Sequence, residues 1–170
     1  MHRPLTAAQV SENPTTLNEF GYNLKDWIHE LKRISARKEL WERVKQKPRR
    51  LKSLFEGGEV ADAYLAAYVD HLCRLSKIPA PDWVYAPDLV LENPWFSDDV
   101  KTLRLYLMIK TPPAFKEKNI FTIPEVTFTV KIGRPKTSLA HKRALAAKRQ
   151  KAFRKRQKLE LESLRKKALR

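Results

Sequence analysis

Apolar residues in the first half of the chain recur with helical spacing. From Leu17 to Ile34 they return every three or four positions, which predicts a helix with one buried face. Thr16 and Glu19 form a capping-box pattern at its start, in which each side chain bonds the other residue's backbone amide. A second amphipathic stretch surrounds Trp41. A third helix is predicted over residues 59–77, where alanines allow a neighbouring helix to approach closely.

A proline-punctuated aromatic segment follows at residues 79–96. Its prolines exclude a continuous helix. We therefore expect it to run across the helices as a covering layer, with its rings packed on them. A cap, a proline pair and an anchoring aromatic then occur at residues 111–115. The candidate partner-binding residues are the aromatics of this region: Trp83, Trp95, Phe96 and Phe115.

The remaining apolar patterns are shorter. A cap at residues 97–99 predicts a short helix, and Leu105 leaves a buried strand as the alternative. Apolar and polar residues alternate at residues 126–132, which predicts a short strand or extended segment. If the helix forms, we expect four of its apolar residues to face inward: Val100, Leu103, Leu107 and Met108.

Charge divides the chain more sharply than hydrophobicity does. The net charge is +16, yet residues 131–170 hold 16 Lys and Arg against 2 Asp and Glu. Residues 1–130 are therefore nearly balanced, at +2. Residues 138–170 contain neither Gly nor Pro and are rich in Ala, Leu, Lys and Arg, which predicts a long helix. A segregated block of like charge is typical of an interaction arm.

The chemistry of this arm points to nucleic acid. Lys and Arg side chains that neutralise phosphates release counterions, which gives an affinity that falls steeply with salt. Gly133 to Lys136 also resembles the core of an AT-hook, in which an extended backbone and an arginine fit a narrow minor groove. A solvated tail, an acidic protein surface and an anionic membrane are the alternatives. The candidate nucleic-acid-binding residues are Arg134, Lys136, Lys142, Arg143, Lys148, Arg149, Lys151, Arg154, Lys155, Arg156 and Lys158.

Catalytic and metal-binding patterns are absent from the sequence. It contains no Gly-rich phosphate loop, no Gly-x-Ser-x-Gly elbow and no His-Glu-x-x-His motif. His71 and Cys73 lack two further ligands at zinc spacing, so we interpret Cys73 as a buried thiol. We expect no enzyme activity, no cofactor and no metal. The single cysteine, and the lack of a secretory signal or a long apolar span, predict a cytoplasmic protein that is not embedded in a membrane.

Three separated motifs carry a family resemblance. They are the helix at residues 62–72 with the Pro-Ala-Pro-Asp-Trp run at 79–83, the Asn-Pro-Trp-Phe run at 93–96, and the run from Pro113 to Phe121. In this order they resemble a family of small bacterial proteins encoded beside nucleotidyltransferase-type toxins and regarded as antitoxins. The resemblance covers about residues 18–123 and does not include the basic arm. It implies a partner protein.

We therefore predict a mainly α protein in three parts. A flexible leader at residues 1–15 precedes a compact helical interaction domain at 16–130, whose Pro/aromatic-rich segment covers the helices. Residues 131–170 form the basic C-terminal arm, with its long helix. The leading hypothesis is an antitoxin-like protein that neutralises a partner toxin of the nucleotidyltransferase type, while the arm contacts DNA, RNA or the toxin's nucleic-acid site. The alternative is a stand-alone DNA- or RNA-binding regulator or a ribosome-associated protein.

Overall fold

A computed structural model describes residues 3–98, 100–125, 143 and 146–158. The fold is mainly α, as predicted. The chain divides into two compact units, Met1–Lys131 and Ile132–Arg170. The strand predicted at residues 126–132 lies outside the described residues.

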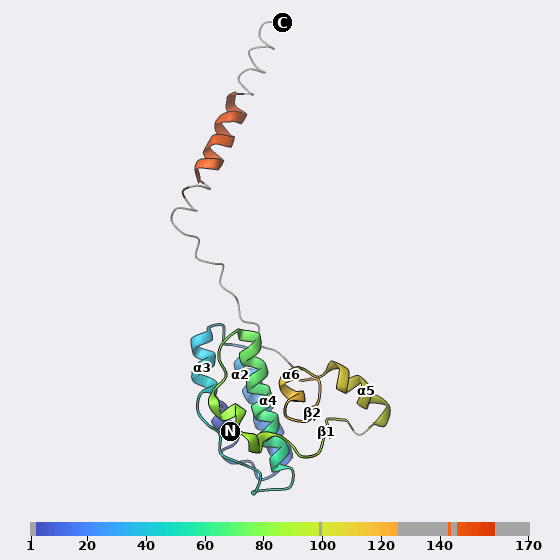
Figure 1. The fold of residues 1–170 in the computed structure, drawn as a ribbon. Coiled ribbons are helices and arrows are strands. Elements are labelled where there is room, and N and C mark those ends of the chain that lie inside the picture. The colour runs from blue at the N-terminus through green and yellow to red at the C-terminus, as the bar shows by residue number, and fades with distance from the viewer. Residues whose placement is uncertain (1–2, 99, 126–142, 144–145, 159–170) are drawn as a thin grey trace, which may run out of the picture. The chain divides into compact units, whose positions relative to one another are not determined.

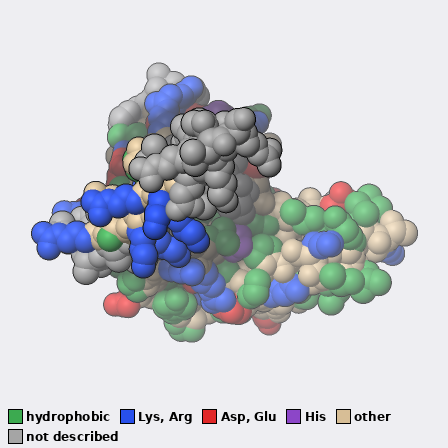
Figure 2. All heavy atoms as spheres, turned by 90° about the horizontal axis from the view of Figure 1, so that it is seen from above, with side chains coloured by type: hydrophobic (Ala, Val, Ile, Leu, Met, Phe, Trp, Pro, Cys, Tyr) green, Lys and Arg blue, Asp and Glu red, His purple; other side chains and the backbone are tan. Residues whose placement is uncertain are grey.

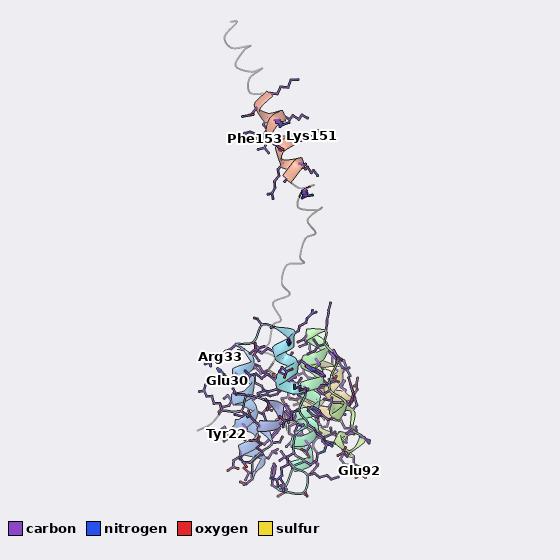
Figure 3. All side chains as sticks on the ribbon, turned by 90° about the vertical axis from the view of Figure 1, so that its left-hand side faces the viewer. Tyr22, Glu30, Arg33, Glu92, Lys151 and Phe153 are labelled. Carbon is purple, nitrogen blue, oxygen red and sulfur yellow. The ribbon has the colours of Figure 1, made fainter. Side chains whose placement is uncertain are left out.

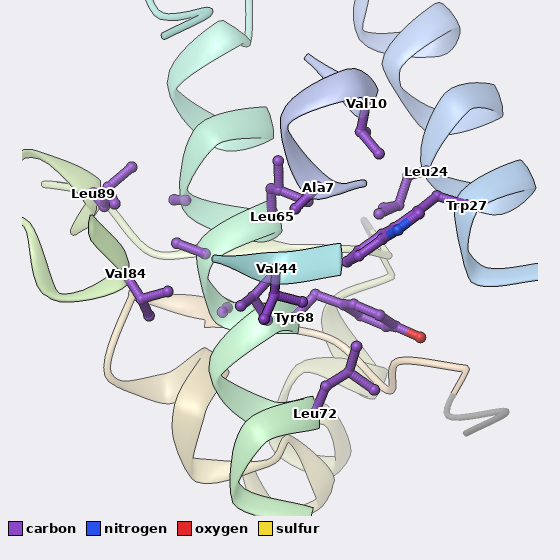
Figure 4. Packing of buried hydrophobic residues seen from close by; sticks show 14 of the residues in the cluster. Ala7, Val10, Leu24, Trp27, Val44, Leu65, Tyr68, Leu72, Val84 and Leu89 are labelled. Carbon is purple, nitrogen blue, oxygen red and sulfur yellow. The ribbon is translucent and has the colours of Figure 1, made fainter. Parts of the chain in front are cut away.

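The centre of the first unit is α4 (Gly58–Ser76), which is buried over most of its length. Its alanines let α2 (Leu17–Leu31) pack on one side and α6 (Pro113–Lys116) on the other (Figure 1). Trp27 of α2 meets Tyr68 of α4 edge to face, with 6.0 Å between the ring centroids (Figure 4). Val44, the last residue of α3 (Arg37–Val44), completes this part of the core.

The capping box predicted at Thr16 forms in part. Thr16 Oγ1 accepts a hydrogen bond from the Glu19 amide at 3.2 Å, as expected. The Glu19 carboxylate instead accepts from the amide and the hydroxyl of Thr15, at 2.8 and 2.7 Å. The helix therefore starts where the sequence predicts, but the Glu19 carboxylate bonds the residue before Thr16 rather than Thr16 itself.

The structure corrects the expectation of a flexible leader at residues 1–15. A short helix, α1 (Ala7–Val10), opens the chain, and both Ala7 and Val10 are fully buried. A complete capping box holds it, because Thr6 Oγ1 accepts from the Gln9 amide while Gln9 Oε1 accepts from the Thr6 amide. This segment belongs to the core of the first unit.

The Pro/aromatic-rich segment covers the helices, as predicted. It contains two short 3-10 helices, η1 (Asp82–Tyr85) and η2 (Pro87–Leu89), which pack on α4. It ends in β1 (Trp95–Phe96), which pairs in parallel with β2 (Ile120–Phe121). Trp83 fixes the segment, since its indole Nε1 donates to the carbonyl oxygen of Val44 at 3.1 Å.

The region after residue 96 forms a helix, α5 (Lys101–Lys110), rather than a buried strand. Its predicted inward face is wrong in three of four positions, because only Leu107 is buried. The other three are 41–51% exposed: Val100, Leu103 and Met108. The reason is positional, because α5 packs mainly against β2, at the edge of the unit opposite α2 and α3 (Figure 1).

Candidate nucleic-acid interface

The described part of the basic arm is a helix that is exposed throughout. Residues 143 and 146–158 are helical, and all of them are exposed (Figure 3). Ala, Gln, Lys and Arg make up this stretch apart from Phe153, and these residue types favour a helix. At about 1.5 Å per residue, positions 146–158 extend over roughly 20 Å.

Helical periodicity sorts the side chains of this helix into a basic side and a charge-free strip. At 3.6 residues per turn, positions separated by three, four or seven residues share a face. The strip consists of residues with that spacing: Ala146, Gln150, Phe153 and Gln157. The same rule places four lysines along one line of the basic side, which we call the lysine face: Lys148, Lys151, Lys155 and Lys158.

Positive charge on this helix is not balanced locally. Residues 146–158 contain seven Lys and Arg and no Asp or Glu. Some cations of the first unit are paired instead: Arg50 pairs with Asp88 at 2.9 Å, and Arg74 pairs with Asp70 at 2.7 Å. Exposed cations without local counter-charges create a strong positive potential that attracts polyanions. A run of phosphates supplies the matching charge.

The predicted nucleic-acid-binding residues divide into two groups. Eight lie in the described helix and are exposed: Arg143, Lys148, Arg149, Lys151, Arg154, Lys155, Arg156 and Lys158. The other three lie outside the described residues, and with them the AT-hook-like tetrapeptide: Arg134, Lys136 and Lys142. Residues 146–158 place seven of the first group on one helix, and Arg143 is exposed before it.

The structure removes two of the four candidate partner-binding aromatics from the surface. Phe115 is fully buried, and its ring lies 5.2 Å from that of Tyr64. Trp83 is 9% exposed and bonded through its indole to the backbone of α3. Both rings anchor the covering segment and α6 to the core. The sequence pattern identified large apolar rings but did not distinguish rings that bind a partner from rings that pack inside.

The other two aromatics are half-buried in the small sheet. Trp95 packs edge to face on Tyr64, with ring centroids 6.4 Å apart. Phe96 stacks on Phe121 at 4.9 Å, and the Arg104 guanidinium lies 5.0 Å from its ring centroid. Their main contacts are therefore within the chain.

A polar cluster on the first unit ties α4 to the segment that follows α6. Arg74 donates to both carboxylate oxygens of Glu117, at 2.9 and 2.6 Å, and pairs with the buried Asp70. These bonds lower the pKa of Glu117. The mutual pairing of the charges indicates a structural role for this cluster.

Burial raises the pKa of the Cys73 thiol to about 12, so Cys73 is a protonated, buried thiol at neutral pH.

The exposed apolar side chains of α5 form a candidate surface that was not predicted from the sequence. Leu105 and Ile109 are 68% and 66% exposed, respectively, although both are strongly apolar. The sequence contains a pattern that indicates such a surface, because the apolar residues of this stretch fall on all sides of a helix rather than on one face.

In the described part of the chain, no three His, Cys, Asp or Glu residues lie close enough together to hold a metal ion. The helices that the structure describes include none long and apolar enough to cross a membrane. Comparison of the chain with known protein families, with characterised proteins and with solved structures found no match.

Proposed function

We propose that this chain is a nucleic-acid-binding protein whose basic arm contacts phosphates. The observation that carries the proposal is the helix at residues 146–158, which is exposed at every position and bears seven cationic side chains and no acidic one. Phosphate contacts position a protein on nucleic acid without reading its sequence. We therefore propose binding that is strong at low salt and largely independent of base sequence.

The first unit is nearly neutral and folds around its own core, separately from the basic arm. Residues 1–130 carry a net charge of only +2, and their helices form a core of their own. The first unit contributes little long-range attraction to a polyanion, so the arm supplies most of the affinity.

A truncation experiment tests this division of roles. Fluorescence anisotropy compares the full chain with a chain ending at Lys131, using a labelled DNA duplex, a labelled single-stranded RNA and, as a competitor, heparin. We expect the full chain to bind both nucleic acids, and the shortened chain to lose most of this affinity while the first unit keeps its thermal unfolding transition. Equal affinity of the two chains would refute the role of the arm.

Neutralisation of a toxin is the second candidate, and it rests on the family resemblance of residues 18–123. In this hypothesis the helical unit binds the toxin, and the arm contacts operator DNA, RNA or the toxin's nucleic-acid site. Co-expression with the neighbouring gene tests it. Rescue from toxicity and co-purification of the two proteins support the hypothesis, and failure of both refutes it.

A further inference from the structure

Helix α5 exposes an unusual amount of apolar surface for its length. Only Leu107 of its ten residues is buried. Hydrophobic side chains cover the lobe that it forms, at the right of Figure 2, among a few lysines and arginines. The six apolar side chains that are at least 41% exposed form what we call the α5 surface: Val100, Leu103, Leu105, Tyr106, Met108 and Ile109.

The α5 surface extends around the helix instead of lying on one side. Two positions along a helix correspond to a rotation of about 200°. Leu105 and Ile109, each two residues from Leu107, therefore point away from the side on which Leu107 packs. A helix that is apolar all round is typical of a buried position. Contiguous exposed apolar surface of this kind marks an interaction site.

The first unit holds α5 in place through the buried side chain of Leu107 and through contacts toward both ends of the helix. At its C-terminal end, the hydroxyl of Thr111 lies 2.6 Å from the Leu107 carbonyl oxygen and accepts from the Thr122 amide at 2.9 Å. Nearer its N-terminal end, the guanidinium of Arg104 lies over the ring of Phe96. These contacts fix the helix while leaving most of its circumference uncovered, so a partner meets a preformed helix.

The charges of α5 indicate what covers it. The helix contains Lys101, Arg104 and Lys110, all exposed, and no acidic residue. Among the residues that the structure describes, no ion pair involves any of the three. A second copy of the chain would bring two positively charged helices together, which is unfavourable. An amphipathic helix lying on a membrane needs a polar side opposite its apolar side, and α5 has none.

We propose that α5 inserts into an apolar groove with an acidic rim on a partner protein. Helix-in-groove recognition uses apolar anchors three, four and seven residues apart. Leu105 and Ile109, four residues apart, have this spacing, and so have Val100 and Leu103, three residues apart. Acidic side chains at the rim pair with the three cations of α5. This inference is independent of the arm, because it uses only residues of the first unit.

The test starts from the full chain in the cells that encode it. A photo-crosslinking phenylalanine derivative replaces Leu105 in one variant and Tyr22 in a control variant, since Tyr22 is 71% exposed on α2. The protein captured from position 105 is then purified and titrated with the wild type, Leu105→Asp, Ile109→Asp and the matched control Tyr22→Asp. The control removes an exposed apolar side chain and introduces the same charge, but on α2 rather than on α5.

We expect one protein to be captured from position 105 and not from position 22. Each of Leu105→Asp and Ile109→Asp should weaken its binding at least about tenfold, whereas Tyr22→Asp should leave it unchanged. Binding of the wild type should weaken as salt is raised. Three outcomes would overturn the proposal: capture of the chain itself, Leu105-dependent binding to phosphatidylglycerol vesicles instead of a protein, or equal effects of all three substitutions. Circular dichroism verifies that each variant keeps its helices.

Discussion

Removal of the Asp62 carboxylate should destabilise the first unit by disconnecting the loop before α4. Asp62 Oδ1 and Oδ2 lie 3.0 and 2.9 Å from the Leu51 amide nitrogen, and Oδ2 accepts from the Lys52 amide at 3.1 Å. Leu51 is fully buried, so water cannot replace the bond to its amide. Asp62→Ala leaves that buried donor without an acceptor.

The expected magnitude follows from these two donors. A buried unsatisfied donor costs about 1–3 kcal/mol, and the more exposed Lys52 amide loses roughly 1 kcal/mol when water takes over its bond. Burial also raises the pKa of Asp62, so desolvation offsets part of the gain from the bonds in the wild type. The two donors sum to about 2–4 kcal/mol, and with this offset we expect Asp62→Ala to lower the free energy of unfolding by about 1–3 kcal/mol. Asp62→Asn keeps one acceptor oxygen and should lower it by less.

Urea unfolding followed by tryptophan fluorescence measures both changes. Trp27 and Trp83 are buried in the first unit and report its unfolding. Asp82→Ala is the control, because Asp82 is exposed at the start of η1, and it should change stability by at most about 0.5 kcal/mol. If Asp62→Ala matches this control, the carboxylate does not hold the loop.

Four further measurements follow from the structure. Gly21→Ala should stabilise the chain by about 0.5–1 kcal/mol in thermal unfolding, because nothing lies within 4 Å of the added Cβ and alanine favours a helix. Gly58→Ala should destabilise it by about 1–3 kcal/mol or more, because the added Cβ meets the Leu51 carbonyl oxygen at close range; equal effects at the two glycines would contradict this. Cys73 should react with Ellman's reagent only after unfolding, and fast reaction in native buffer would contradict its burial and raised pKa. The folded-state pKa of Glu117 is lowered by its bond to Arg74, so its contribution to stability is present above the unfolded pKa and lost as pH falls through the folded pKa; Glu117→Gln should be less stable than the wild type at neutral pH, and the difference should vanish in acid.

The long helices were predictable because their apolar spacing is strong. The prediction for residues 17–34 corresponds to α2 (Leu17–Leu31), and that for 59–77 corresponds to α4 (Gly58–Ser76). Such helices bury one stripe against the core, so their period is visible without a structure. The parallel pairing of β1 with β2 was not predicted, since each strand has only two residues and shows no alternation.

Two features of the first unit were not predicted from the sequence, for opposite reasons. Helix α1 has four residues, too few for apolar periodicity, although the Thr6-Ala7-Ala8-Gln9 run carries its capping box. Helix α5 has abundant apolar residues, but they surround it, so no single face identifies the inward side. Position in the fold decides that Leu107 is buried and Leu105 is not.

The arm shows how far charge patterning alone leads. The charge pattern predicted that the cationic side chains face solvent, and those of the described helix are exposed. Charge patterning does not identify the molecule that these side chains contact, because DNA and RNA both carry phosphates. An experiment is needed to distinguish the two. Burial likewise decided between packing and binding for Trp83 and Phe115. Both residues carry large aromatic rings, and the sequence pattern alone did not show that these rings pack inside the protein.

The salt dependence of DNA binding tests the central claim most directly. The observed binding constant of the full chain for a duplex of about 20 base pairs is measured between about 50 and 200 mM salt. Each phosphate contact contributes about 0.9 to the slope of log K against log salt, so replacing the lysine face with glutamine should reduce the slope by up to about 3.6. Gln150→Ala together with Gln157→Ala, on the charge-free strip, should leave it unchanged. A slope that is the same for the wild type and the lysine-face variant would contradict phosphate binding by this helix.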